Sequence, residues 1–172
     1  PPSIQGEEDG NYATQPLLEL VKKANKQKPS AIIIGCFDDT GLEQAREISL
    51  CPVLGIGESS FLLSYLFSGE TAVITTVHEA VPIIKKNIKN AGYSTFISEV
   101  IAADVEVLDL EFNPAQSAVK FAQASKALDG STQNIILGCA GAVKIKDEFE
   151  TITGYKSFDG VTSAAKLCRA LL

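Results

Sequence analysis

Two stretches of the sequence determine the expected fold: AIIIGCFDDTGLEQAREISLCPVLGIGES at 31–59 and NIILGCAGAVKIKDEFETITGYKSFDGVTS at 134–163. Each begins with a short run of apolar, β-branched residues and then reaches Gly-Cys, a turn, a segment with helical spacing and a second short strand pattern. A short, wholly apolar run bounded by turn residues is typical of a parallel strand that is covered on both faces. The same order in both halves of the chain predicts one β-α-β unit in each of two similar lobes.

Short strands and helices alternate along the rest of the chain as well. Beyond the two repeats, we expect strands at 72–76 and 105–110, and helices at 80–91 and 115–128. Residues 1–11 are rich in Pro, Gly and acidic residues, which predicts a loop, with the first helix starting at Thr14. Strands that alternate with helices in this way predict an α/β fold with parallel sheets.

The repeat also predicts how the chain divides. We expect two similar α/β lobes with parallel sheets, related by a pseudo-twofold axis, and an active site in the cleft between them. Lobe 1 is predicted to comprise residues 1–68 and 155–172 and to carry Cys36. Lobe 2 is predicted to comprise residues 69–154 and to carry Cys139.

Composition argues against several classes of function. The 15 Lys and Arg residues stand against 21 Asp and Glu, and the net charge of −6 argues against nucleic acid and anionic membranes as partners. No apolar run approaches the ~20 residues that a membrane-spanning helix needs, so we expect a cytoplasmic protein. His78 is the single histidine and no Cys-x-x-Cys motif occurs, which argues against a metal site. The chain starts at Pro1 and contains no Met, so we expect the sequence to be either the interior of a longer chain or one from which Met has been left out.

Cys36 and Cys139 hold matching positions in the two repeats, each directly after a strand. Ligands of open parallel sheets bind at the carboxyl ends of the strands. A thiol at that place faces the amino end of the next helix, which is expected to lower its pKa. Two such thiols facing each other across a cleft could act as base and acid on opposite faces of one stereocentre, which is the chemistry of racemisation.

The two cysteines could also have a purely structural role. A single buried cysteine is most often a small apolar core residue, although two at matching positions of a repeat are harder to account for in this way. A Cys36–Cys139 disulfide is a second alternative, but it would be unusual in the cytosol. Cys51 and Cys168 lack the strand-to-turn context, and we expect both to be core thiols.

The motifs around the cysteines belong to a larger set: GCFDDTGL (35–42), AREI (45–48), PVLGIGES (52–59), AVITT (72–76), ILGCAGA (136–142) and FDGVTSAAKL (158–167). In order and spacing they resemble the hydantoin/allantoin racemase branch of the aspartate/glutamate racemase superfamily, over nearly the whole chain. The resemblance implies a cofactor-independent racemase with two similar α/β lobes. It also implies that Cys36 and Cys139 are the two acid/base residues, and that the N-terminal strand of lobe 1 lies outside this chain.

The residues that follow the cysteines bear on the substrate. Superfamily members that act on free glutamate or aspartate carry polar Asn-Thr and Thr-Glu pairs there, whereas this chain has Phe37-Asp38 and Ala140-Gly141. These residues leave room and backbone donors for a flat, uncharged ring such as a 5-substituted hydantoin. The motifs CFDDTG and GIGE resemble allantoin-type members more than alkyl-hydantoin members, so allantoin is our first choice of substrate and a 5-substituted hydantoin the second. The resemblance further assigns ligand binding to Pro2, Ser3, Thr75, Thr76 and Gly138.

Several points stay undecided in the sequence. Asp38, Asp39 and Glu58 lie near the predicted mouth of the site, where they could hydrogen-bond a ligand or cap helices. Gly55-x-Gly57 lacks the third Gly and the Lys of a phosphate loop, so we interpret it as a turn that permits close packing. Two other functions stay open: an aspartate/glutamate racemase, and a non-catalytic small-molecule-binding or thiol-sensing α/β protein. A small molecule is the expected partner throughout, and the surface pattern leaves homo-oligomerisation undecided.

Overall fold

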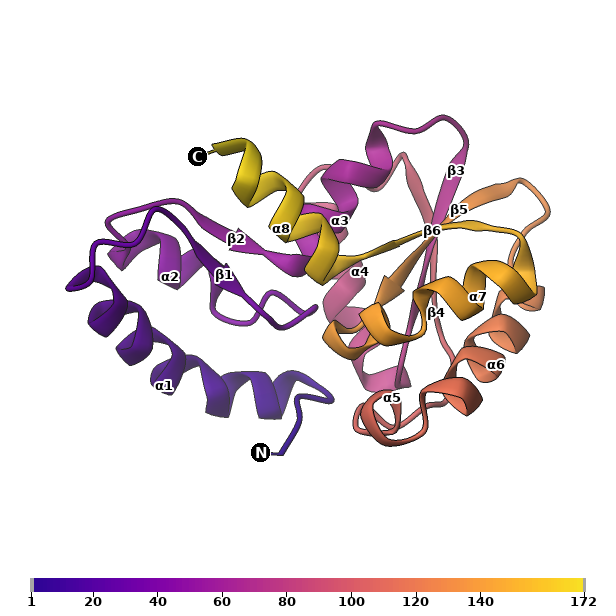
Figure 1. Ribbon diagram of the computed structural model, residues 1–172, viewed down its shortest axis with the longest axis horizontal. Coiled ribbons are helices and arrows are strands. Elements are labelled where there is room, and N and C mark those ends of the chain that lie inside the picture. The colour runs from indigo at the N-terminus through magenta and orange to yellow at the C-terminus, as the bar shows by residue number, and fades with distance from the viewer. Residues whose placement is uncertain (1, 172) are drawn as a thin grey trace.

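The computed structural model describes residues 2–171 and contains two parallel sheets (Figure 1). The smaller sheet pairs β1 (Ile32–Ile34) with β2 (Val53–Gly55). The larger sheet has the order β4-β3-β5-β6, with β3 at Glu70–Thr75, β4 at Ile97–Ala102, β5 at Thr132–Gly138 and β6 at Lys156–Asp159. Every neighbouring pair in it is parallel. The expected α/β fold with parallel sheets is confirmed.

Helices connect these strands and cover the sheets. The smaller sheet is accompanied by α1 (Glu7–Asn25) and α2 (Leu42–Ile48). The other helices are α3 (Ile56–Tyr65), α4 (Val81–Asn90), α5 (Asp109–Phe112), α6 (Pro114–Ala124), α7 (Lys146–Thr153) and α8 (Gly160–Leu171), with 3-10 turns η1 (His78–Ala80), η2 (Ser125–Ala127) and η3 (Ala140–Lys144). Within residues 2–171, no helix combines the length and the apolar character that crossing a membrane requires.

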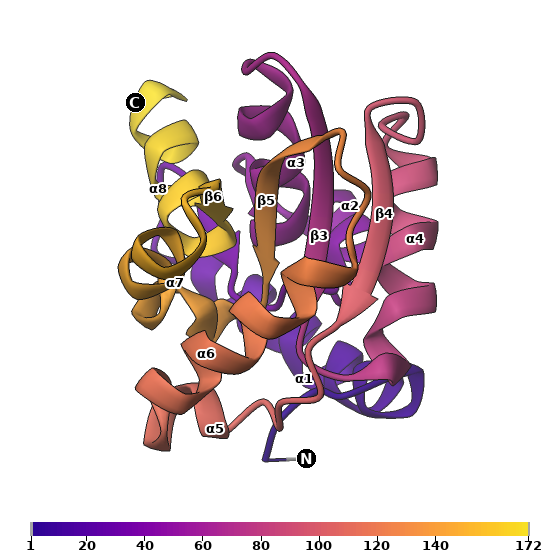
Figure 2. The same ribbon diagram turned by 90° about the vertical axis from the view of Figure 1, so that its right-hand side faces the viewer.

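The larger sheet is buried on both faces, because successive residues of a strand point to opposite sides. On one face, Ala72 and Ile74 of β3 pack in a cluster with Phe121 of α6. On the other face, Val73 packs in a cluster with Phe61 of α3. Figure 2 shows α6 in front of this sheet and α3 behind it. Burial of these apolar side chains is the main term that stabilises this part of the fold.

The smaller sheet is covered on one face only. Ile34 of β1 and Val53 of β2 pack with Val21 of α1, whereas Ile33 remains 41% exposed. The prediction that the apolar run beginning at Ala31 is covered on both faces is therefore wrong. The helices α1 and α2 line one side of the two-stranded sheet, so Ile33, which points to the other side, is partly exposed to solvent.

The first helix is longer than the sequence pattern indicated. It begins at Glu7 rather than Thr14, so the loop predicted for residues 1–11 is wrong from Glu7 onward. Acidic side chains in its first turn favour the positive end of the helix dipole, and the Asp9 carboxylate accepts a hydrogen bond from the Gln5 backbone amide at 3.1 Å. These interactions outweigh the turn-forming character of the glycines in this segment.

The strand predicted at 105–110 is also wrong, because the fourth strand of the structure is β4, at Ile97–Ala102. Polar residues at Ser98 and Glu99 interrupt the apolar pattern of β4, which is an edge strand of the larger sheet. Leu110 lies instead on α5, where it is fully buried.

The two sheets are joined by α3, which follows β2 and precedes β3, and by the C-terminal segment that packs on it. Strand β6 pairs with β5 in the larger sheet, while α8 packs on α3. Figure 1 shows α3 and α8 between the two sheets. The lobe boundaries at residues 68 and 155 stay a prediction.

Candidate active site

A pocket of about 140 Å³ opens at the carboxyl ends of β1, β3 and β5. Segments far apart in the sequence contribute to its lining: Ile4, Gly35, Cys36, Phe37, Asp38, Thr75, Thr76, Ala80, Val107, Gly138, Cys139 and Ala140. Parallel strands present their carboxyl ends at a common edge, where open α/β sheets bind ligands. The structure therefore brings both repeat cysteines to one pocket.

Most residues singled out in the sequence line this pocket, namely Cys36, Phe37, Asp38, Thr75, Thr76, Gly138, Cys139 and Ala140. Pro2, Ser3 and Gly141 are not part of the lining. Ile4, which follows Ser3, reaches the pocket instead. Gly141 packs against Leu110, where an added Cβ would lie 2.9 Å from the Leu110 Cβ. The N-terminal contact is thus made one residue further along the chain than expected.

Cys36 lies in the turn between β1 and α2. Its carbonyl accepts a hydrogen bond from the Asp39 amide at 3.0 Å, and its Sγ lies 3.4 Å from the Thr40 Oγ1. Burial raises the pKa of this thiol; the Thr40 hydroxyl opposes the rise and the charge of Asp38 adds to it. The expected lowering of the pKa is therefore wrong, because loss of solvent outweighs the nearby donors.

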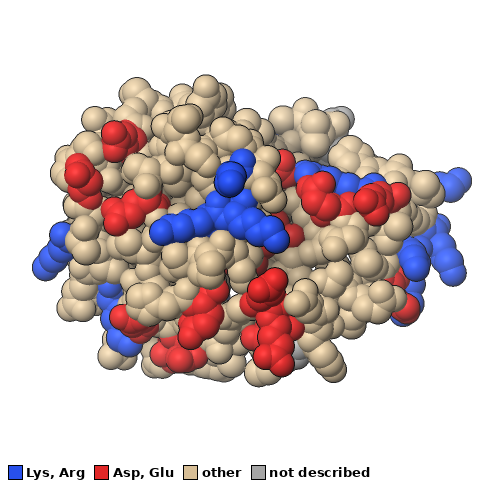
Figure 3. Space-filling view, turned by 180° about the vertical axis from the view of Figure 1, so that it is seen from behind, with Lys and Arg blue, Asp and Glu red and all other residues tan. Residues whose placement is uncertain are grey.

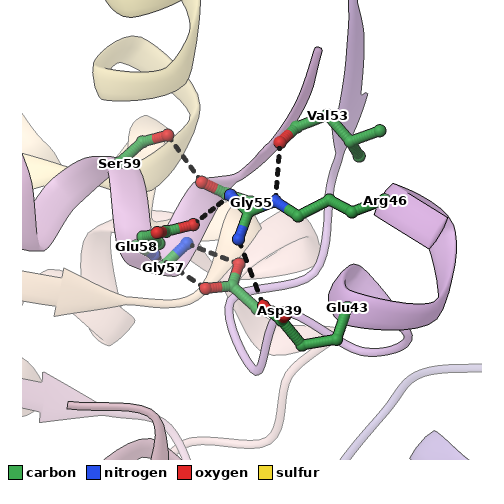
Figure 4. Close-up of polar contacts among 8 residues, drawn as sticks. All are labelled: Asp39, Glu43, Arg46, Val53, Gly55, Gly57, Glu58 and Ser59. Atoms are coloured by element: carbon green, nitrogen blue, oxygen red, sulfur yellow. Dashed lines mark hydrogen bonds and ion pairs between the residues drawn. The ribbon is translucent and has the colours of Figure 1, made fainter. Parts of the chain in front are cut away.

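The Asp39 carboxylate anchors the Cys36 turn to the amino end of α3 (Figure 4). It accepts hydrogen bonds from the backbone amides of Gly57 at 2.9 Å and Glu58 at 2.7 Å. Two otherwise unpaired donors of the helix are thereby satisfied by a side chain 18 and 19 residues earlier in the sequence. Burial raises the pKa of Asp39 to about 7 against the opposing effect of these amides.

Gly55 and Gly57 make room for this anchor. A Cβ on Gly55 would lie 2.2 Å from the Asp39 Oδ1, and a Cβ on Gly57 would lie 2.4 Å from the Phe37 carbonyl oxygen. Both distances are far below van der Waals contact, so the two glycines are required for the turn to approach α3. The interpretation of Gly55-x-Gly57 as a site of close packing is confirmed, although Gly55 ends β2 and Gly57 already lies in α3.

Arg46 completes the support of the Cys36 turn. Its guanidinium forms ion pairs with Glu43 and Glu58, and its Nε donates to the Val53 carbonyl at 3.2 Å. Of the three acidic residues placed near the mouth by the sequence, Asp39 caps α3 and Glu58 pairs with Arg46. Only Asp38 lines the pocket.

Cys139 is held mainly by the backbone. It directly follows β5, is 9% exposed, and begins η3, whose Ala142 amide donates to the Cys139 carbonyl at 3.2 Å. The preceding Gly138 carbonyl accepts a hydrogen bond from the buried Thr75 hydroxyl at 2.9 Å. An added Cβ on Gly138 would lie 3.1 Å from the Thr75 Cβ. Thr75 therefore fixes the end of β5 from the neighbouring strand β3.

The Cys139 thiol also has a raised pKa, of about 11. Burial is the largest cause, and the negative charges of Cys36 and Asp38 add to it. Hydrogen bonds from the backbone amides of Gly141 and Ala140 oppose the rise. The expected lowering is therefore wrong here too, although Gly141, outside the lining, does support the thiolate through its amide.

The cysteines are not paired. All four are free thiols, so the Cys36–Cys139 disulfide is absent from the structure. Cys51 and Cys168 are partly exposed rather than buried in the core, contrary to expectation. Among residues 2–171, no group of three or more His, Cys, Asp or Glu side chains is arranged to hold a metal ion.

The electrostatic character of the pocket is set by one residue. Asp38 is the single charged side chain among the described residues that line it, and burial raises its pKa to about 6. The lining otherwise offers two thiols, two threonine hydroxyls and small or apolar side chains. A pocket of this kind suits a small, largely uncharged ligand rather than an anion.

The chain is similar to known proteins over its whole length. The family model described as Asp/Glu/Hydantoin racemase matches residues 1–168. The chain belongs to the Asp/Glu/Hydantoin racemase family. A hydantoin racemase from Rhizobium meliloti is 36% identical over 175 aligned positions, which cover 100% of this chain and 72% of that protein. As a member of this racemase family the chain is an isomerase, and the resemblance inferred from its motifs is confirmed.

Solved structures of the Asp/Glu/Hydantoin racemase family share the fold. An allantoin racemase from Klebsiella pneumoniae superposes with a TM-score of 0.90 at 28% identity, covering 99% of this chain and 70% of that chain. An allantoin racemase from Pseudomonas fluorescens also gives a TM-score of 0.90, at 27% identity, covering 98% of this chain and 72% of that chain. The parallel α/β architecture is therefore that of the family.

Sequence reasoning missed several lining residues and one supporting residue. Ala80 and Val107 reach the pocket from η1 and from the segment after β4, and neither carries a polar group that would attract attention. Gly35 lies inside a motif but was not predicted as a site residue. The role of Asp39 was left open between a ligand contact and a helix cap, and no local pattern decides between them, because the Gly57 amide that it binds lies 18 positions later.

Proposed function

We propose that the chain is a cofactor-independent racemase that interconverts the enantiomers of an uncharged hydantoin-type ring, with allantoin first and other 5-substituted hydantoins second. The observation that carries this proposal is the presence of Cys36 and Cys139 in one small pocket that contains no Lys, Arg or His among its lining residues. The names of the related racemases support the same substrate class.

The proposed reaction is a proton transfer between two thiols. The stereocentre of a hydantoin lies next to a carbonyl, so the carbanion left by deprotonation shares its charge with that oxygen. The thiolate of one cysteine removes the proton from one face, and the thiol of the other delivers its own proton to the opposite face. The enantiomer leaves with the protonation states of Cys36 and Cys139 exchanged, and the reverse reaction restores them. No bond other than the carbon–hydrogen and sulfur–hydrogen bonds changes.

The other lining residues are proposed to hold the ring. Gly138 and Ala140 leave space beside Cys139, and Phe37 offers an apolar wall that is fixed by edge-on packing against Phe61 at a ring separation of 6.0 Å. The Thr76 hydroxyl is proposed to bind a ring N–H or C=O group, whereas the Thr75 hydroxyl, which already donates its proton to the Gly138 carbonyl, is proposed only to accept from a ring N–H. Pro2 and Ser3 remain proposals of the resemblance alone, beside the pocket residue Ile4.

An aspartate or glutamate racemase is the second candidate within the same family. A free amino acid carries an α-carboxylate, which in a pocket of this size calls for a cation or several directed donors. The lining residues supply neither a guanidinium nor an ammonium group. The charge of Asp38 repels the α-carboxylate but attracts the α-ammonium group of a free amino acid, so the uncharged ring is favoured by the lack of a cation for the carboxylate.

The test is isotope exchange with purified protein. Single enantiomers of allantoin, a 5-alkyl-hydantoin, glutamate and aspartate are incubated in D2O, and optical rotation is followed together with deuterium at the stereocentre by NMR. We expect enzyme-dependent loss of rotation with deuterium uptake for the rings and no change for the amino acids.

The matched control tests whether the loss of a cysteine outside the pocket affects racemisation. The variant Cys51→Ser removes a free cysteine that lies outside the pocket, and it should racemise like the wild type. Binding of a ring without deuterium uptake would support the non-catalytic alternative and overturn the proposal. Uptake with glutamate or aspartate alone would favour the amino-acid racemase.

A further inference from the structure

The side chain of Asp38 differs from every other acidic side chain around the Cys36 turn. The Asp39 carboxylate is occupied by two backbone amides, and the Glu58 carboxylate is paired with Arg46. Among residues 2–171, no hydrogen bond or ion pair reaches the Asp38 carboxylate. The Asp38 side chain faces the pocket, so its hydrogen-bonding capacity is directed at whatever enters there.

The backbone of Asp38 is fixed even though its carboxylate is not. The Asn87 side chain, on α4, donates a hydrogen bond to the Asp38 carbonyl at 2.7 Å. On one side of Asp38 in the sequence, Phe37 is buried, and on the other, Asp39 anchors the turn. The carboxylate is thereby presented to the pocket from a rigid position. Its charge is felt by both Cys36 and Cys139.

We propose that Asp38 determines specificity: its carboxylate accepts N–H donors of an uncharged ring and rejects ligands that carry a carboxylate. A partly buried carboxylate without a partner has lost hydrogen bonds to water and has gained none from the protein. A ligand rich in N–H groups replaces those lost hydrogen bonds. A ligand carboxylate would instead place two like charges in one small, poorly solvated pocket.

A second observation points the same way. Next to the pocket lies a hollow lined by five carboxylate side chains, those of Glu7, Glu8, Asp9, Glu79 and Glu106, together with Gln5, Gly6 and Val77. The hollow and the pocket meet through adjacent residues of three segments, and the Gln5 side chain accepts a hydrogen bond from the Val107 amide at 3.4 Å. Among the described residues 2–171, no Lys or Arg lines this hollow.

The acidic hollow reinforces Asp38 at longer range. In Figure 3, acidic side chains gather at the lower edge of the molecule, where α5 and the N-terminal end of α1 lie in Figure 1. Acid-lined clefts raise the local concentration of neutral and cationic ligands relative to anions. An anion is thus disfavoured on approach and again inside the pocket.

This selectivity, which rests on the proposed function, would place the racemase before hydrolytic opening of the ring. Hydrolytic opening of a hydantoin ring produces an N-carbamoyl amino acid, which bears a carboxylate. A racemase that excludes this anion continues to work while a ring-opening hydrolase accumulates its product. The substrate class is therefore the closed ring, and the excluded class is the ring-opened acid.

The test compares affinities for a matched ligand pair. The dissociation constants of allantoin or a 5-alkyl-hydantoin and of the corresponding ring-opened acid are measured by calorimetry for the wild type, Asp38→Asn, Asp38→Glu and Glu79→Gln. In Asp38→Asn we expect the acid to bind about tenfold more tightly and the ring about tenfold more weakly. Asp38→Glu should retain the preference for the ring, and Glu79→Gln should change the ratio by less than about threefold.

The outcomes separate this proposal from the proposed function. A ratio of ring to acid affinity that Asp38→Asn leaves unchanged overturns the role of Asp38 alone. Wild-type binding of the ring without deuterium exchange overturns racemisation and leaves the selectivity of Asp38 intact. Wild-type binding of the acid as tightly as the ring overturns the exclusion of anions.

Discussion

The Cys36 turn and the Cys139 turn occupy matching places in the sequence repeat, but different interactions hold them. The Cys139 turn follows the central strand β5 and is fixed by backbone hydrogen bonds and by the Thr75 hydroxyl on the Gly138 carbonyl. The Cys36 turn follows the short strand β1 of a two-stranded sheet and is fixed by the Asp39 side chain on α3. A repeat in sequence therefore specifies where the thiols lie and not how firmly each is supported.

Among changes to the surroundings of the two thiols, the largest expected effect comes from breaking the anchor of the Cys36 turn. In Gly57→Ala the new Cβ would lie 2.4 Å from the Phe37 carbonyl oxygen and 2.8 Å from the Asp39 Oδ2, so the turn must move away from α3. We expect the free energy of unfolding to fall by about 3 kcal/mol and kcat to fall about 100-fold. Urea unfolding and racemase assays measure the two effects. Gly130→Ala is the control, because no atom lies within 4 Å of a Cβ added there.

The second prediction concerns the Asp38 carboxylate, whose burial lowers the free energy of unfolding when it is ionised. The Cys139 turn has no such carboxylate. Burial raises the pKa of Asp38 to about 6, above the ~3.9 of an unfolded chain. The folded state therefore holds this proton to higher pH, so its stabilising effect is complete below about pH 4 and is lost as the pH rises through about 6.

The variant Asp38→Asn removes this titration. Between pH 4 and pH 8, the free energy of unfolding of the wild type should fall by about 2 kcal/mol more than that of Asp38→Asn. Urea unfolding across this range measures the difference. The exposed Asp147 gives the control variant Asp147→Asn, which should follow the wild type. A wild-type profile that rises relative to Asp38→Asn over the same range would contradict the prediction.

The third prediction sharpens the difference between the two thiols themselves. Cys36 is partly exposed and has the Thr40 hydroxyl as a partner, whereas Cys139 is buried and its pKa is raised to about 11. Only the thiolate reacts with iodoacetamide, so Cys36 should be alkylated about tenfold faster than Cys139 at pH 8. Peptide mass spectrometry distinguishes the four cysteines. Equal rates would show that the two turns do not differ in this respect.

The smallest expected effect concerns the support of the Cys139 turn. Thr75→Val keeps the shape of the side chain and removes the hydrogen bond to the Gly138 carbonyl. We expect a loss of about 1 kcal/mol in the free energy of unfolding and a fall of about fivefold in kcat. The buried Thr71, whose hydroxyl has no partner among the described residues, provides the control Thr71→Val, which should not lower kcat. Equal effects of the two variants on kcat would contradict a specific role of Thr75.

Much of this organisation could be predicted from the sequence, because it depends on short-range patterns. The apolar runs before Cys36 and Cys139 identify both strands and the edge of the sheet at which the thiols lie. Strand β4 was not predicted, since Ser98 and Glu99 interrupt its pattern at the edge of the sheet. The amino end of α1 was also not predicted, since its glycines resemble a loop.

The chemistry of the pocket depends on contacts between distant segments and was harder to predict. The direction of the pKa shifts is set by burial. Burial depends on how distant segments assemble around the pocket, which no local pattern reveals. The different tasks of Asp38 and Asp39 were likewise hidden in the sequence. Asp38 and Asp39 are adjacent residues of the same type, and they acquire different roles only because the fold brings α3 to Asp39.

The measurement that tests the central claim most directly is deuterium exchange by the two single-cysteine variants. Cys36→Ser and Cys139→Ser are each incubated in D2O with each enantiomer of the ring, with Cys51→Ser as the control. The account predicts that each catalytic variant loses racemisation by at least about 1,000-fold and still exchanges the α-proton of one enantiomer, the opposite one in each variant. Racemisation retained by either variant, or exchange of the same enantiomer by both, would contradict the two-thiol mechanism.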